Sequence, residues 1–170
     1  QAVEVPAGDG GPPVRVYPIP YLDPLAAAHL ARAQALPGDE PTARFTHHDA
    51  MAWAMARVQQ DLAGAGAARS VVVAHTFLTG GEPSASEREL TMGHVEQVGM
   101  SVFDGIDYVA LGHLHRRQAF DGGRVAYSGT PLRYSFSEQS NIPSVRLVDL
   151  TAAGTLACQQ VELGVGRPMR

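Results

Sequence analysis

Apolar runs separated by polar breaks predict several strands along the chain. SVVVAHT, at 70–76, is a continuous β-branched run of the kind found in strands buried within parallel sheets. FDGIDYVALGHLH predicts a second buried strand at about 106–111, and VRVYPIPYL, at 14–22, predicts a shorter one around two prolines. Residues 1–13 and 79–101 are rich in glycine and polar residues, so we expect loops there, the second with a short helical piece.

Helical spacing of apolar residues predicts two helices in the first half of the chain. Asp23 and Pro24 suit the cap and the first position of a helix over 23–36. Thr46 and Asp49 have the spacing of a capping box at the start of a longer helix. One face of this second helix carries a stripe of residues that we expect in the core: Met51, Met55, Val58 and Leu62.

The last third of the chain predicts two β-hairpins. Residues 117–121 and 124–128 flank the turn sequence DGG, and residues 144–150 and 156–163 form a second pair of strands. The predicted class is therefore α/β, with parallel strands in the middle of the chain and antiparallel strands after them.

Composition and charge narrow the class of protein. The 170 residues suffice for one domain, and the 45% hydrophobic and 18% charged residues are ordinary for a globular protein. No apolar run is long enough to span a membrane, and no signal peptide is evident. A single cysteine, Cys158, excludes an internal disulfide and fits the cytoplasm. The net charge of −4 argues against a general polyanion-binding surface but allows a local basic patch.

Three of the seven histidines stand out by their position. His75, His113 and His115 each follow a predicted buried strand, and the carboxyl edge of an open α/β sheet is where ligands bind. Neutral imidazole is a common ligand of divalent transition metals. For the histidines on or near predicted helices we expect structural roles, and the one in the long loop is ambiguous: His29, His47 and His48, then His94.

The His-x-His spacing limits the kind of metal site. In an extended chain, His113 and His115 would lie on one face about 6–7 Å apart, which suits two ions about 3.5–4 Å apart. Gly112 would let the backbone approach such a site closely. Three histidines also suffice for a single catalytic zinc, and His-x-His occurs by chance in loops.

Three stretches of the chain closely resemble one family. They are VVVAHTFLTGGEPSASEREL, SVFDGIDYVALGHLHRRQ and VAYSGTPLRYSFSE, at 71–90, 101–118 and 125–138. They are similar to the bacterial SbcD nucleases, the DNA double-strand-break repair branch of the calcineurin-like metallophosphoesterases, and the resemblance covers about residues 14–165. It implies a two-sheet sandwich flanked by helices.

The resemblance also implies roles for the histidines. His75 and His113 match ligands of one metal ion, and His115 matches a ligand of the second. The implied ions are two Mn²⁺, with Mg²⁺ as a substitute, which activate a water for attack on a phosphodiester.

Several other residues have both a functional and a structural interpretation. Arginines are candidates to contact DNA phosphates, or they belong to a solvated surface: Arg116, Arg117 and Arg133. Ser128–Pro131 fits either a segment beside the active site or an ordinary turn. The polar run 84–89 is either a loop near phosphate or a solvated helix start, and Trp53 fits a contact surface.

The chain departs from the family pattern in its first part. The family's Asp-x-His, Gly-Asp-x-x-Asp and Gly-Asn-His-Asp motifs are absent, and the single asparagine, Asn141, is not followed by histidine. We therefore expect residues 1–165 to be a partial nuclease domain whose N-terminal half is missing, with the bridging carboxylate and the catalytic acid histidine outside this chain. Residues 166–170 would begin the linker to an absent capping region, and this chain alone would be inactive.

The function that the resemblance implies is that of a subunit of a manganese-dependent DNA nuclease. Such an enzyme is a 3′-to-5′ double-strand exonuclease and single-strand endonuclease in DNA repair, recombination and replication. Its expected partners are DNA and an SbcC-type ATPase, with a homodimer inside a heterotetramer, in the cytoplasm and away from membranes. Two alternatives remain: another metallophosphoesterase acting on small phosphodiesters, or a degenerate, metal-poor scaffold domain.

Overall fold

The computed structural model describes residues 1–34, 44–66, 68–83, 97–153 and 156–165. Within these ranges, a mixed sheet has six strands in the order β1-β2-β3-β6-β8-β7. Their bounds are Val3–Val5, Val14–Ile19, Arg69–His75, Tyr108–Gly112, Val125–Tyr127 and Gln118–Phe120. The four inner strands run parallel, while the short edge strands β1 and β7 are antiparallel to their neighbours. The α/β class is therefore confirmed.

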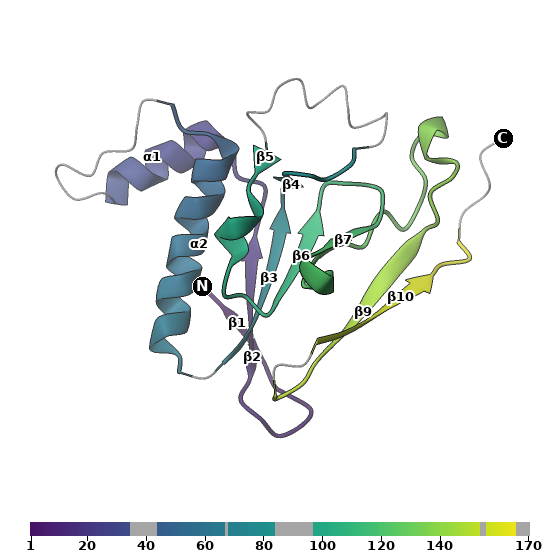
Figure 1. Cartoon of the computed structure of the whole chain (residues 1–170). Helices are drawn as coiled ribbons and strands as arrows, with labels where there is room; N and C mark the ends of the chain where they lie inside the picture. The colour runs from purple at the N-terminus through teal and green to yellow at the C-terminus, as the bar shows by residue number, and fades with distance from the viewer. Residues whose placement is uncertain (35–43, 67, 84–96, 154–155, 166–170) are drawn as a thin grey trace.

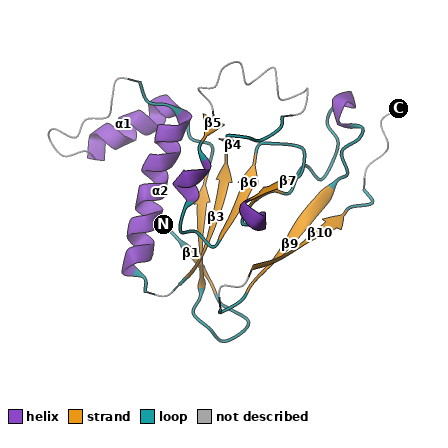
Figure 2. Cartoon of the chain, in the orientation of Figure 1, coloured by secondary structure: helices purple, strands orange, loops and turns teal. Residues whose placement is uncertain are grey.

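Helices cover one face of this sheet (Figures 1 and 2). They are α1, Pro24–Gln34, and α2, His47–Gly64. The predicted capping box at α2 is present, because the Thr46 hydroxyl accepts from the Asp49 amide and the Asp49 carboxylate accepts from the Thr46 amide. Neither helix in the described ranges has the length and apolarity that crossing a membrane requires.

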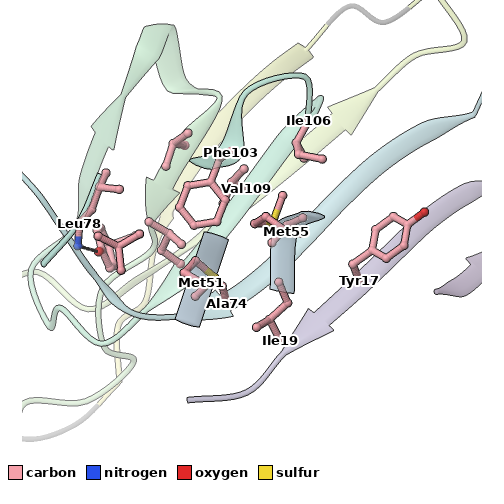
Figure 3. Close-up of a cluster of buried hydrophobic side chains, with 14 of the residues drawn as sticks. Tyr17, Ile19, Met51, Met55, Ala74, Leu78, Phe103, Ile106 and Val109 are labelled. Atoms are coloured by element: carbon pink, nitrogen blue, oxygen red, sulfur yellow. Dashed lines mark hydrogen bonds between the residues drawn. The ribbon is translucent and has the colours of Figure 1, made fainter. Parts of the chain in front are cut away.

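The main core lies between α2 and the sheet. Figure 3 shows Met51 and Met55 of α2 among the side chains of the inner strands, and these methionines are 2% and 1% exposed. Val58 is also buried, and Leu62 packs against the same cluster from its edge. The predicted apolar stripe is thus confirmed, and it fixes α2 across β2, β3 and β6.

Both predicted hairpins are present. β7 and β8 pair with Ala119 opposite Ala126, around a short 3-10 turn at Asp121–Gly123. β9, Ser144–Leu150, and β10, Leu156–Glu162, form a separate two-stranded sheet. A second small sheet joins β4, Phe77–Leu78, to β5, Gln97–Val98. β1 and β5 lie in segments for which the sequence predicted no strand: a loop over 1–13, and a loop with a short helical piece over 79–101.

The β9–β10 hairpin faces the side of the sheet away from the helices and diverges from it toward the strand carboxyl ends (Figure 1). At the amino end of β3, Arg69 holds the two together by donating to the Leu150 carbonyl at 2.7 Å and to the Asp9 carboxylate at 3.0 Å. A groove of about 500 Å³ separates the sheet from the hairpin near this clamp. Farther along β3 on this face, Val73 is 44% exposed, which is unusual for a central parallel strand.

Candidate functional site

Two of the predicted histidines meet at the carboxyl ends of neighbouring strands. His75 is the last residue of β3, and its register partner on β6 is Gly112, so His113 begins the loop beside it. The ring centroids of His75 and His113 are 5.3 Å apart, and the ring planes are nearly perpendicular at 86°. Parallel pairing of β3 with β6 therefore brings together residues 38 positions apart in the sequence.

The absence of a side chain at Gly112 leaves room for the His75 ring. A Cβ atom at this position would lie 3.2 Å from Nδ1 of His75, which is closer than most such contacts in proteins. The sequence predicted that Gly112 would allow a close approach to the site, and this geometry fits that prediction. The group that approaches Gly112 is the imidazole of His75 on the neighbouring strand.

The backbone turns sharply at His113. Its φ angle is +116°, a conformation that residues with side chains rarely adopt. The extended His-x-His geometry that the sequence suggested is therefore wrong at this position. The two imidazoles have different neighbours: His113 stacks on Phe77, with ring centroids 5.8 Å apart and planes at 24°, whereas His115 contacts the loop before β9.

His115 is held by a buried carboxylate. Its Nδ1 lies 2.6 Å from Oε1 of Glu138, whose side chain is 0% exposed. The other oxygen of Glu138 accepts a hydrogen bond from the backbone amide of Tyr134 at 2.8 Å. The Tyr134 ring lies beside the imidazole, with centroids 5.9 Å apart and planes tilted by 51°. The sequence assigned no role to Glu138, although it ends the SFSE stretch that carried the family resemblance.

The Ser128–Pro131 segment packs against the His-x-His loop and is hydrogen-bonded to its backbone. The Thr130 amide donates to the His115 carbonyl at 3.1 Å. Gly129 has a φ of +83°, and a Cβ there would meet the His115 carbonyl and the Arg117 amide at 3.0 Å each. Of the two interpretations of this segment, the structure favours a turn that fixes the loop, because its contacts here are made through the backbone.

Tyr21 and His47 flank the histidine pair and had not been singled out as site residues. The Tyr21 hydroxyl lies 2.9 Å from Nε2 of His47, the first residue of α2. The Tyr21 ring meets the His75 ring edge-on, with centroids 6.2 Å apart. The carboxyl end of β2 and the amino end of α2 thus close one side of the site.

The other histidines divide as follows. His48 accepts a hydrogen bond from the Gly99 amide at 3.1 Å and joins α2 to the segment after β5, which fits the expected structural role. His29 is exposed on α1. His94 lies outside the described residues, as does the polar run 84–89.

The spacing of His75 and His113 fits one shared metal ion. A coordinating nitrogen lies about 2.1 Å from such an ion, so two imidazoles on the same ion have ring centres about 5 Å apart. Within the described ranges, no group of three or more His, Cys, Asp or Glu side chains is arranged to hold a metal. If the pair binds an ion, it would supply two of the ligands, and the others would come from elsewhere or from water.

The three candidate arginines differ in their surroundings. Arg116 and Arg117 are 50% and 39% exposed and form long ion pairs with Glu82, at 3.4 Å, and Glu162, at 3.5 Å. Arg133 instead donates from Nε to the Asn141 carbonyl at 2.8 Å and so ties together the loop that contains Glu138. Arg116 and Arg117 remain available to an incoming anion, whereas the position of Arg133 fits a structural role.

The candidate site thus comprises a histidine pair at two strand ends, a third histidine fixed by a buried carboxylate, and a tyrosine at the edge. A scan of the chain against models of known protein families finds no match.

Proposed function

We propose that this chain is the C-terminal part of an SbcD-type nuclease domain, within the calcineurin-like metallophosphoesterases, and that the complete protein hydrolyses DNA phosphodiester bonds with two manganese ions. The observation that carries this proposal is the 5.3 Å approach of the His75 and His113 rings at adjacent strand ends. This spacing supports a shared ion, as the family resemblance implies.

The different neighbours of the imidazoles support two ions. His113 lies beside His75, whereas His115 lies against Glu138 and Tyr134. A single site would need all three rings to converge, whereas ligands of two ions about 3.5–4 Å apart need not share neighbours. When bound, such ions supply an activated water and stabilise charge on the phosphoryl oxygens. Magnesium, which prefers oxygen ligands, is proposed as a substitute on the family resemblance alone.

The second face of the sheet supports the two-sheet sandwich. The β9–β10 hairpin lies on this side, and Val73 on the central strand β3 is 44% exposed. Packing of a second sheet against this face would bury such residues. We propose that the N-terminal half of the domain forms most of that sheet. It would also bring the bridging carboxylate and the acid histidine to the ends of β3 and β6.

DNA would approach over the His-x-His loop. Arg116 and Arg117 follow this loop directly, and their long ion pairs lie at the surface, where such pairs contribute only about 0–1 kcal/mol. A DNA phosphate, which arginine can bind through two parallel hydrogen bonds, would compete with Glu82 and Glu162. The SbcC-type ATPase partner, the homodimer and the cytoplasmic location are proposed on the family resemblance alone.

The test is nuclease activity of the complete protein on linear duplex DNA with manganese. His75→Ala and His113→Ala are expected to lower the rate at least about 100-fold, because each removes a ligand of the ion that activates water. His29→Ala, an exposed histidine on α1, is the matched control and should keep the wild-type rate. Wild-type activity in His113→Ala would refute the proposal.

A second candidate is a scaffold domain without catalysis, because the family's Asp-x-His, Gly-Asp-x-x-Asp and Gly-Asn-His-Asp motifs do not occur in this sequence. Direct titration with manganese separates the two functions. Binding by the complete protein supports the nuclease, and no binding, together with association with an ATPase, supports the scaffold. Cleavage of small chromogenic diesters without cleavage of duplex ends would instead favour another phosphodiesterase.

A further inference from the structure

Glu138 is a carboxylate buried next to an imidazole. Its side chain is 0% exposed, and it lies on the short 3-10 helix Phe136–Glu138, at a point where the surrounding loop is largely exposed. Burial of a carboxylate costs free energy unless its oxygens are satisfied. Both oxygens are satisfied here, Oε1 by His115 and Oε2 by the Tyr134 amide.

The contact with His115 fixes the position of a proton. An ionised carboxylate can only accept hydrogen bonds, so an ionised Glu138 at 2.6 Å accepts a hydrogen bond from an N–H at Nδ1 of His115. In the neutral imidazole the lone pair is then on Nε2, the ring nitrogen that faces away from Glu138. A metal-binding histidine commonly donates its other N–H to a carboxylate, which sets both the tautomer and the ring orientation.

The backbone around Glu138 keeps this contact rigid. The Glu138 amide donates to the Ser135 carbonyl at 3.0 Å, and its carbonyl accepts from the Asn141 amide at 2.9 Å. On the other side, the His115 carbonyl is held by the Thr130 amide. His115 is thus connected to the 130–141 loop twice, through its backbone carbonyl to the Thr130 amide and through its imidazole to Glu138.

We infer that Glu138 is the positioning residue for His115: it holds the ring in the Nδ1–H tautomer and presents Nε2 as the atom that binds a divalent cation. This inference rests on the proposed function for the identity of the cation. The tautomer and the orientation of the ring follow from the buried pair itself.

The first measurement is the tautomer of His115, read from its ring-nitrogen chemical shifts and couplings by NMR of the metal-free wild-type protein. We expect hydrogen on Nδ1 and none on Nε2 at a pH where the ring is neutral. Hydrogen on Nε2 alone would overturn the inference. This measurement needs no variant, so it stands even if a substitution at position 138 disturbs folding.

The second measurement is manganese affinity, by calorimetric titration of the complete protein. Glu138→Gln keeps the shape of the side chain but removes its charge. An amide has an acceptor at only one of the two positions where the carboxylate oxygens meet His115 and the Tyr134 N–H. We expect about 10- to 100-fold weaker binding at the ion that His115 serves. Ser137→Ala, on the same short helix, is the control and should bind as the wild type does.

The outcomes separate this inference from the proposed function. Unchanged manganese affinity in Glu138→Gln overturns the inference even if the protein is an active nuclease. Weakened affinity with the Nδ1–H tautomer sustains the inference even if no DNA is cleaved, and only the proposed function then fails. If the wild-type protein binds no manganese, the role toward a cation is overturned together with the metal site.

Discussion

At the scale of single residues, the geometry of the candidate site depends on the unusual backbone conformation of His113 and on the close contact between Gly112 and the His75 ring. His113 holds a φ of +116°, and strained conformations of this kind cost about 1–3 kcal/mol and cluster at functional sites. Sequence reasoning singled out His75 and His113, which the structure brings together, because both stand at the ends of strongly apolar strands. It did not find Glu138 or Tyr21, since their partners are 23 and 26 residues away and no periodic pattern connects loop residues with one another.

Gly112→Ala tests whether the space beside the His75 ring matters for metal binding. The new Cβ would lie 3.2 Å from Nδ1 of His75 and would displace the ring by a few tenths of an ångström. We expect roughly 10-fold weaker manganese binding by calorimetry, in the range seen when the support of a metal ligand is disturbed.

Gly8→Ala is the matched control, since a Cβ at Gly8 meets nothing within 4 Å. If the two alanine variants bind manganese equally well, the His75 ring does not depend on the space that Gly112 leaves.

At the scale of elements, the sequence predicted α2 and the parallel strands, but not the short strands β1 and β5. The stripe around Met51 and the run 70–76 each carry their pattern over enough residues to identify a helix and a strand. β1 and β5 have three and two residues, so only their pairing partners define them, and pairing is a property of the tertiary fold. The two hairpins were predictable because turn sequences separate their strands.

Thr46→Ala tests the contribution of the capping box to α2. The substitution removes the hydroxyl that accepts from the Asp49 amide and leaves a helix N–H without that bond. We expect the free energy of unfolding in urea to fall by about 1 kcal/mol, within the usual range of about 0.5–2 kcal/mol for lost caps.

Thr79→Ala serves for comparison, because this exposed threonine donates its backbone amide, which alanine retains, to the Val98 carbonyl. Equal stabilities of the two variants would show that the cap does not stabilise α2.

At the scale of the whole molecule, the Asp9–Arg69 pair joins the N-terminal loop, the central sheet and the β9–β10 hairpin. Arg69 donates to Asp9 and to the carbonyls of Pro12 and Leu150, and the Ala152 amide also donates to Asp9. Hydrogen bonds from the Gly11 amide and from Arg69 lower the pKa of Asp9 below its ordinary value of 3.8. No local sequence pattern predicted this clamp, because its members lie in three separate segments.

The lowered pKa of Asp9 predicts a pH-dependent contribution to stability. Because the folded protein binds the proton less readily than the unfolded chain does, the charged carboxylate stabilises the fold at pH above 3.8. This contribution is lost as the pH falls below 3.8 through the lower pKa of the folded state. The wild type should therefore exceed Asp9→Asn in free energy of unfolding at neutral pH, and the difference should shrink in acid.

Urea unfolding at a series of pH values measures this difference. Asp104→Asn is the control, because Asp104 is 72% exposed and its pair with Arg124 is 3.9 Å long. If the difference in free energy of unfolding between the wild type and Asp9→Asn stays constant from neutral pH to below 3.8, the charged Asp9 carboxylate is not the cause of that difference.

The central claim is that His75 and His113 share one divalent ion while His115 serves a second. Anomalous X-ray scattering at the manganese edge, from crystals of the complete protein grown with manganese, tests it most directly. The account predicts two peaks about 4 Å apart, one within about 2.2 Å of a ring nitrogen of both His75 and His113 and the other beside His115. Manganese bound elsewhere, or no peak beside His75 and His113, would contradict it.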